Sequence, residues 1–193
     1  MTTPKLNLSD TISVTNYANN TQAILHIHSV VSDLEVHFPA FLTDFSQTFD
    51  STWNTEDVFG RMDPIATFQN TKRTISLGFD IPSATSDGAK INLQKTQNLV
   101  KMVYPVYKDI GGTSVLSKPP LVRIQFANLL KGISNDGLLG WVSGLSWKPD
   151  IQMGMFASSG EFYPKVISIS FSFNVLHEQT LNQETLNNWP FGV

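Results

Sequence analysis

The sequence predicts a mainly β fold, a sandwich or a barrel, with one amphipathic helix packed on it. Apolar residues alternate with polar ones through several short runs, which is the pattern of strands with one buried face. One run, at about 87–104, instead repeats its apolar positions every three or four residues, as a helix does. We expect a single domain over residues 1–193, with an N-terminal arm at about 1–20 and a C-terminal tail at about 179–193.

The strands are predicted from their alternation. From Lys165 to Val175, five apolar residues alternate with serines and an asparagine, and Arg73 to Ile81 repeats the pattern. Core packing is the simplest explanation for three tryptophans in alternating runs, and Gly140 and Gly144 indicate a bulge or a close backbone approach. Weaker alternation predicts strands at 23–31, 34–38, 44–53, 121–126 and 138–147, and the tryptophans are Trp53, Trp141 and Trp147.

The helix has a defined start and end. Ser86 or Asp87 can cap its first turn, and Pro105 makes continuation past Tyr104 unfavourable. Its apolar positions step by four and three, so they line one face only. We therefore expect the helix to close an open edge or end of the sheet. The positions that form this face are 89, 93, 96, 100 and 103.

Composition excludes several classes of protein. Charged residues make up 15% of the chain, against about 25% in typical soluble domains, and the net charge is −3. The chain therefore lacks the excess of lysine and arginine that tight nucleic-acid binding needs. The chain has no cysteine, which excludes disulfide scaffolds and thiolate metal sites. Neither a secretory signal nor a membrane span is apparent, so we expect synthesis in a cytoplasm and no membrane partner.

Candidate catalytic and metal-binding residues are few. His26 and His28 share a strand face and His37 could approach across a hairpin, which is a zinc set in principle. No carboxylate motif is tied to them, so we favour partly buried or interface histidines and expect no metal and no cofactor. A nucleophile elbow, a P-loop and a dinucleotide-binding motif are all missing from the sequence. The chain is therefore predicted not to be an enzyme, and no catalytic residue is assigned.

The few charges are unevenly placed. Eight lie between Asp50 and Asp80, whereas only Glu178 and Glu184 follow Lys165. Two acidic residues could form a carboxylate pair for hydrolysis, but ion pairing that sets register at an interface explains the cluster better. An aromatic C-terminal tail without charge suits docking on another subunit. The expected contact residues are Glu56, Asp57, Arg61, Asp63, Lys72 and Arg73, and the expected docking residues are Trp189, Pro190 and Phe191.

Residues 53–76 carry the sequence WNTEDVFGRMDPIATFQNTKRTIS, which resembles a signature of tail proteins from contractile-tailed bacteriophages. The specific resemblance is to the tube initiator proteins that join the baseplate hub to the tail tube. Further agreement comes from LVKMVYP at 99–105, PLVRIQFANL at 120–129, GLLG at 137–140 and YPKVIS at 163–168, so the likeness covers roughly residues 40–180.

The resemblance implies a tail-tube-like β fold with one helix that assembles as a homohexameric ring in the virion. Such a ring would sit on the baseplate hub, template the tail tube and continue the lumen through which DNA leaves, without binding the DNA tightly. The alternative in the same class is the major tail tube protein. Two other classes stay open: a β-sandwich carbohydrate-binding module of a host-recognition structure, and a metal-dependent hydrolase.

Overall fold

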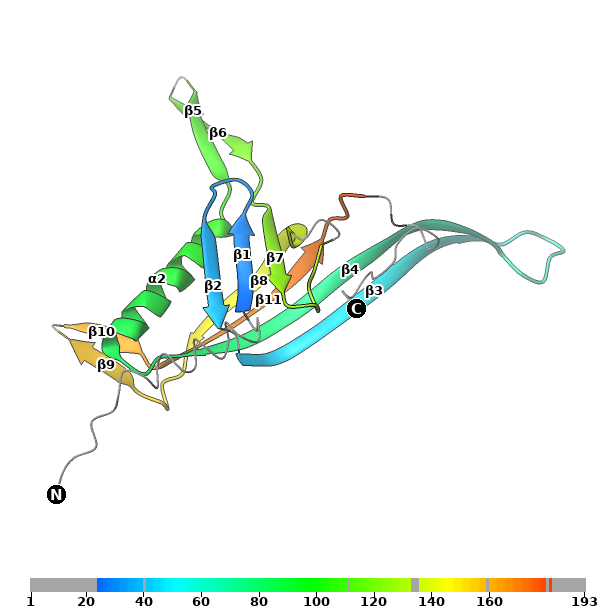
Figure 1. Ribbon diagram of the computed structural model, residues 1–193. Coiled ribbons are helices and arrows are strands. Elements are labelled where there is room, and N and C mark those ends of the chain that lie inside the picture. The colour runs from blue at the N-terminus through cyan, green and yellow to red at the C-terminus, as the bar shows by residue number, and fades with distance from the viewer. Residues whose placement is uncertain are drawn as a thin grey trace.

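The computed structural model describes residues 24–39, 41–110, 112–132, 136–158, 160–179 and 181. Strands dominate these residues and one helix interrupts them, so the predicted mainly β class with one helix is confirmed (Figure 1). The elements are β1 (Ile24–Ser29), β2 (Glu35–Pro39), β3 (Phe41–Glu56), β4 (Ile65–Pro82), α2 (Ser86–Met102), β5 (Val106–Ile110), β6 (Thr113–Lys118), β7 (Val122–Phe126), β8 (Leu138–Pro149), β9 (Met155–Ser158), β10 (Glu161–Pro164) and β11 (Val166–Val175).

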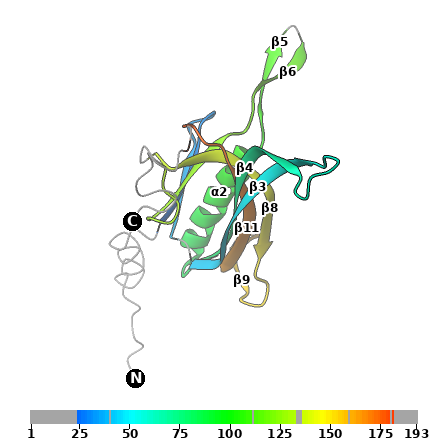
Figure 2. The ribbon, with the colours of Figure 1, turned by 90° about the vertical axis from the view of Figure 1, so that its right-hand side faces the viewer.

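The main sheet is antiparallel and bends over on itself. Its order is β2-β1-β7-β8-β11-β4-β3. Phe38 of β2 and Phe79 of β4 nevertheless pack together with ring centroids 5.5 Å apart, although four strands separate them in the ladder. Figures 1 and 2 show β1, β2 and β7 on one side and β4, β8 and β11 on the other. The edge strands β2 and β3 are not hydrogen-bonded to each other, so the fold is an open sandwich and the barrel is not closed.

The core fills the space between the two halves of the bent sheet. The alternating residues predicted to face inward on β11 and on the second half of β4 are all buried, which confirms both strand predictions. Strands β1, β2 and β7 contribute the same kind of side chain from the other side. The buried sets are Ile167, Ile169, Phe171, Phe173 and Val175 on β11, Ile75, Leu77, Phe79 and Ile81 on β4, and Leu25, Ile27, Val36, Phe38, Val122, Ile124 and Phe126 opposite.

Helix α2 closes the side of this core next to edge strand β2, as expected. Leu99 and Met102 enter the core, and Lys95 Nζ donates a hydrogen bond of 3.1 Å to the His37 carbonyl of β2. The prediction that Ser86 or Asp87 caps the helix is wrong. The N-cap is Thr85, one residue before Ser86, because Thr85 has the extended backbone of an N-cap. Its hydroxyl accepts the Gly88 N–H at 3.1 Å.

Both interpretations of the β8 glycines are confirmed. A Cβ on Gly140 would lie 2.1 Å from the Asn174 carbonyl oxygen, so only glycine allows β11 to approach here. Gly144 has φ +62 and sits where the pairing of β8 with β11 shifts register, which is a β-bulge. The two glycines therefore shape the pairing between the central strands of the sheet.

Two hairpins leave the body of the sandwich. Strands β3 and β4 are far longer than their neighbours and run well past the core, and the β5–β6 hairpin projects separately (Figures 1 and 2). Strands β5, β6, β9 and β10, and the first half of β4, were not predicted from the sequence. These segments contribute almost nothing to the buried core, so the alternation that marks a half-buried strand is weak in them.

The contact between the two halves of the sheet predicts energetic coupling between Phe38 and Phe79. Replacing each by Leu, singly and together, should give a coupling of about 0.5–1.5 kcal/mol in the free energy of unfolding, because the aromatic contact is lost only once. Chemical denaturation measures it. The control combines Phe38→Leu with Phe41→Leu, because Phe41 is half-exposed. The effects of these two changes on the free energy of unfolding should be additive. Additivity of the Phe38 and Phe79 changes would contradict the bent sheet.

Candidate assembly surface and histidine cluster

The β3–β4 hairpin carries the face of the core out into solvent; we call it the arm. Phe45, Phe49 and Trp53 lie on one face of β3 at intervals of four residues. Their partners on β4 are Leu77, Arg73 and Phe68. Leu77 is buried in the core, so this series continues the core face beyond the body, and we call it the apolar face of the arm.

The outer part of this face is exposed in the single chain. Phe49, Trp53 and Phe68 are 43%, 56% and 50% exposed, and the rings of Trp53 and Phe68 contact each other edge to face at 5.3 Å. Among the described residues, His177, Gln179 and Leu181 line a groove with Phe49, Phe68 and Thr71, so they cover part of this face. The apolar face of the arm is thus a surface of aromatic side chains that the fold does not bury.

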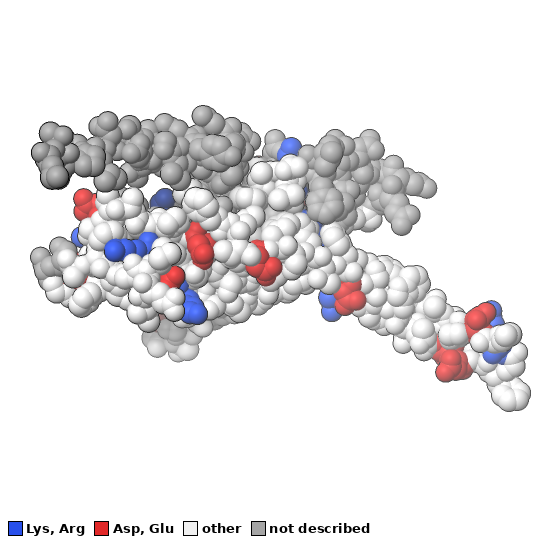
Figure 3. All heavy atoms as spheres, turned by 90° about the horizontal axis from the view of Figure 1, so that it is seen from below, with Lys and Arg blue, Asp and Glu red and all other residues white. Residues whose placement is uncertain are grey.

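The other face of the arm is polar. Ser46 lies opposite Ser76, Thr48 opposite Thr74, and Asp50 opposite Lys72. The two faces therefore differ in chemistry: the polar face lacks large apolar side chains at these positions, whereas the other face carries aromatic residues with the polar pair Ser51–Thr71 between them. Viewed from below, the arm is mostly uncharged along its length and carries acidic and basic side chains at its far end (Figure 3).

The core packing expected for the tryptophans is wrong. Trp53 lies on the arm beyond the core, Trp141 faces outward opposite Asn174, and Trp147 lies in a groove beside Leu93 and Val100 of α2. Trp141 and Trp147 are 42% and 43% exposed. Trp53 lies beyond the end of the opposing layer, which alternation along a strand does not show. The bulge at Gly144 places Trp141 and Trp147 on opposite faces of β8, so Trp141 points away from the core.

The six residues expected to make inter-subunit contacts fall into two groups. Five are exposed, and four of these surround the turn of the arm, where Gly60 has φ +82. In the described part of the chain, none of these four forms an ion pair, so the expected mutual pairing is not seen. The four are Glu56, Asp57, Arg61 and Asp63; the fifth, Lys72, lies on the polar face.

Arg73 is the exception, because it is 1% exposed. Its Nε and Nη2 donate to Gln47 Oε1 at 3.1 and 2.6 Å, and its guanidinium lies 5.3 Å from the centre of the Phe49 ring. Burial lowers the pKa of Arg73 to about 10. Arg73 is therefore an internal anchor at the base of the arm, and an exposed contact role for it is wrong. The sequence gives no signal that Arg73 is buried, because a basic residue at the start of an alternating run is ordinarily expected on the surface.

The β5–β6 hairpin is a second exposed element. Tyr107 and Leu116 lie opposite each other and are 62% and 57% exposed, and every residue of β6 is exposed. The Gly111-Gly112 pair between two β-branched or aromatic runs was the available signal for this hairpin.

The expected docking tail, Trp189, Pro190 and Phe191, lies outside the described residues, as does the N-terminal arm at 1–20. Just before the tail, Arg123 of β7 binds Glu178 through two hydrogen bonds of 2.8 and 2.5 Å. The guanidinium lowers the pKa of Glu178 and the carboxylate raises that of Arg123. This pair fixes the chain at the point where it leaves β11.

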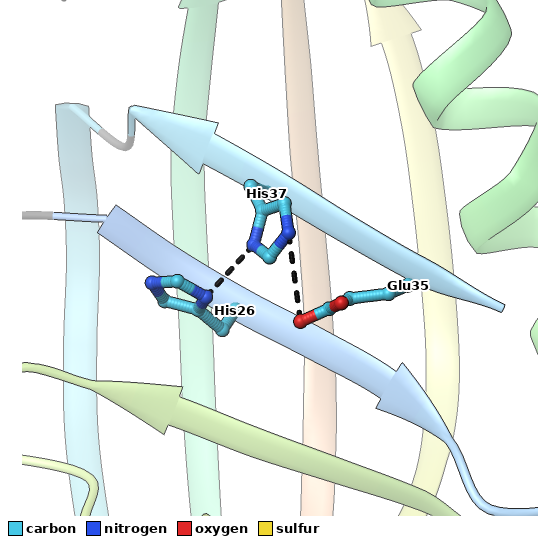
Figure 4. Close-up of side chains that lie close together, drawn as sticks. All are labelled: His26, Glu35 and His37. Atoms are coloured by element: carbon cyan, nitrogen blue, oxygen red, sulfur yellow. Dashed lines mark hydrogen bonds and ion pairs between the residues drawn. The ribbon is translucent and has the colours of Figure 1, made fainter. Parts of the chain in front are cut away.

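A histidine cluster lies on the outward face of the β1–β2 hairpin (Figure 4). His26 and His37 are cross-strand partners with their Nδ1 atoms 2.7 Å apart, and Glu35 Oε1 lies 3.5 Å from His37 Nε2. His28 is on the same face but contacts Asp33 at 3.1 Å. Burial and then the neighbouring His37 lower the pKa of His26. The predicted approach of His37 to His26 is confirmed, and the structure adds a carboxylate.

Comparison with known proteins leaves the family open. No protein-family model matches the chain, and no curated protein matches it. In the described part of the chain, no helix combines the length and the apolar character needed to cross a membrane. The phage-tail role and the absence of enzymatic activity stay predictions.

The Arg73 anchor predicts the effect of removing Gln47. Gln47→Ala leaves the buried guanidinium without the oxygen that accepts two of its hydrogen bonds, so the free energy of unfolding should fall by about 1.5–3 kcal/mol. Thr48→Ala, on the polar face one residue later, should change it by less than about 0.5 kcal/mol. Urea denaturation followed by circular dichroism compares the two. Equal effects would contradict the anchor.

Proposed function

We propose that this protein is a structural subunit of a contractile-phage tail that forms a ring, of six copies as the resemblance implies, at the junction of baseplate hub and tail tube. The observation that carries the proposal is the exposed apolar face of the arm. The segment with the phage-tail resemblance, residues 53–76, covers the outer part of that arm and continues along β4 past the base of the arm at Arg73.

The physical argument begins with the instability of an isolated hairpin. Two strands alone are at best marginally stable in water, and this hairpin exposes aromatic residues along one face. A fully buried aromatic side chain removes about 150–250 Å² from water. Covering the exposed halves of Phe49, Trp53 and Phe68 would contribute on the order of 2 kcal/mol each. A neighbouring subunit that covers this face therefore stabilises both the arm and the assembly.

The shape of the subunit favours a ring or a tube. An arm that docks on the body of the next copy makes a head-to-tail contact between two different surfaces, which closes as a ring or continues as a filament. The exposed β5–β6 hairpin offers a second element for contact with a neighbour or with an adjacent ring. The net charge of −3 fits a lumen through which DNA slides without tight binding.

The major tail tube protein is the alternative within this class. Long tubes formed by the purified protein in negative-stain images would favour it, whereas single rings or monomers would favour the junction.

A carbohydrate-binding module is the second candidate, because Trp141 presents a half-exposed ring on the outer face of β8. Glycan binding that is lost in Trp141→Ala would favour this candidate over a tail protein.

The apolar face of the arm predicts an assembly defect without a folding defect. Trp53→Ser and Phe68→Ser should each shift the protein from the ring to the monomer in size-exclusion chromatography, because each removes apolar surface from the contact. The unfolding midpoint of the monomer should change little, since both side chains are half-exposed. Asn54→Ser, which follows Trp53 on the polar face, is the matched control and should assemble normally. Full assembly of both aromatic variants would overturn the proposed interface.

The charged turn predicts a second effect on assembly. Arg61→Glu should leave the monomer folded and block ring formation, because it reverses a charge that orients the arm against its neighbour. Size-exclusion chromatography measures the assembly and circular dichroism the fold. Arg61→Lys keeps the charge and should restore assembly at least in part. Normal ring formation by Arg61→Glu would show that the turn makes no such contact.

A further inference from the structure

The β1–β2 hairpin places metal-binding side chains in a small array. Residues two apart on a strand share a face, so His26 and His28 of β1 point outward together. The antiparallel register sets His37 opposite His26 and Glu35 opposite His28. Three imidazoles and a carboxylate thus come from two neighbouring strands (Figure 4 shows His26, Glu35 and His37).

The donor atoms of three of these residues converge. One donor atom from each of His26, Glu35 and His37 lies within 4.8 Å of the others. The two Nδ1 atoms are in hydrogen-bond contact at 2.7 Å, so one ring donates its Nδ1–H and the other accepts with its lone pair. Both rings cannot carry a proton on these nitrogens in this geometry, so at least one Nδ1 lone pair points into the cluster.

We propose that His26, His37 and Glu35 bind a divalent transition-metal ion such as Zn²⁺. Two imidazole nitrogens and a carboxylate oxygen are a common zinc ligand set, and the fourth position stays open to water. Zinc–ligand bonds of about 2.0–2.1 Å place tetrahedral ligands roughly 3.3 Å apart. The Nδ1 atoms would separate by about 0.6 Å and the carboxylate would move inward, which are side-chain rotations on an exposed surface.

The surroundings suit a cation. His37 and Glu35 are exposed, and His26 is half-buried. Two basic groups lie near the cluster. Arg123, which lines a hollow with His26 and Glu35, is paired with Glu178 through two hydrogen bonds, and the Lys95 ammonium donates to the His37 carbonyl. Asp136 also lines this hollow.

A bound ion would join the edge strand β2 to β1 by side chains as well as by the backbone ladder. Its presence does not depend on the proposed tail function, because the site uses residues of one hairpin in one chain. Failure of metal binding would therefore leave the ring proposal unchanged, and failure of ring formation would leave the metal site unchanged.

Isothermal titration calorimetry with Zn²⁺ alone, on the full chain without a histidine tag at pH 7.5, tests the proposal. The wild-type protein should bind one equivalent. His26→Gln and His37→Gln should each weaken binding at least about tenfold, and Glu35→Gln should weaken it by a smaller factor. His28 lies on the same face but pairs with Asp33. The His28→Gln variant is therefore the control, and it should bind Zn²⁺ as tightly as the wild type.

Circular dichroism establishes that each variant is folded, which is expected because the altered side chains lie on the surface of the hairpin. Unchanged Zn²⁺ affinity in folded His26→Gln and His37→Gln would overturn the assignment, as would loss of binding in His28→Gln equal to that in His37→Gln. Lack of measurable Zn²⁺ binding by the wild type would overturn the site altogether.

Discussion

The structure depends on the pairing of β4 with both β11 and β3. From Ile75 to Ile81, one face of β4 is buried against the other half of the bent sheet. The same strand continues outward from Arg73 to Ile65 with β3 as its paired neighbour. Side chains two residues apart on β3 share a face, and a bulge in β4 between Asn70 and Phe68 sets Phe68 opposite Trp53. The face that builds the core is therefore continued by the face that the arm exposes. One ladder therefore determines both the stability of the sandwich and the chemistry of its uncovered surface.

Arg73 marks the boundary between these two environments. It is the outermost fully buried residue of β4, and Gln47 accepts two hydrogen bonds from its guanidinium where the apolar cover ends. The pKa of the nearby His177 is lowered, first by its burial and second by the positive charge of Arg73. A polar anchor at this point fixes the direction of the arm relative to the body. A flexible arm would lose more conformational entropy when a neighbour covers it, so a fixed arm favours assembly.

The scarcity of charge has a structural explanation in these surfaces. The arm is polar but nearly uncharged on one face and aromatic on the other, and its charges gather at the turn (Figure 3). Strand β11 carries serines and an asparagine on the face away from the core. A monomer that stayed alone in solution would benefit from more charge on such surfaces. The distribution fits a subunit whose long polar and apolar faces are covered in an assembly.

Sequence reasoning succeeded where a residue's environment repeats with the period of its strand or helix. The inward residues of β11 and β4 and the helix follow from that local rule, and the hairpin between β1 and β2 accounts for the approach of His37 to His26. Sequence reasoning failed where the environment depends on how far the opposing layer extends, as for Trp53 and Arg73. It also failed at Trp141, because the bulge in β8 changes which face a residue lies on. The β5–β6 hairpin was missed because it packs on no core, and Glu35 was missed because its role needs the β1–β2 register.

The central claim, that a neighbouring subunit covers the apolar face of the arm, can be tested by thiol accessibility. The chain has no cysteine, so Thr71→Cys places a unique and nearly isosteric thiol beside Phe49 and Phe68 on that face. The rate of maleimide labelling is compared between the monomer and the self-assembled protein, separated by size-exclusion chromatography. We expect labelling to be at least about tenfold slower in the assembly. Equal rates in the two states would contradict the claim.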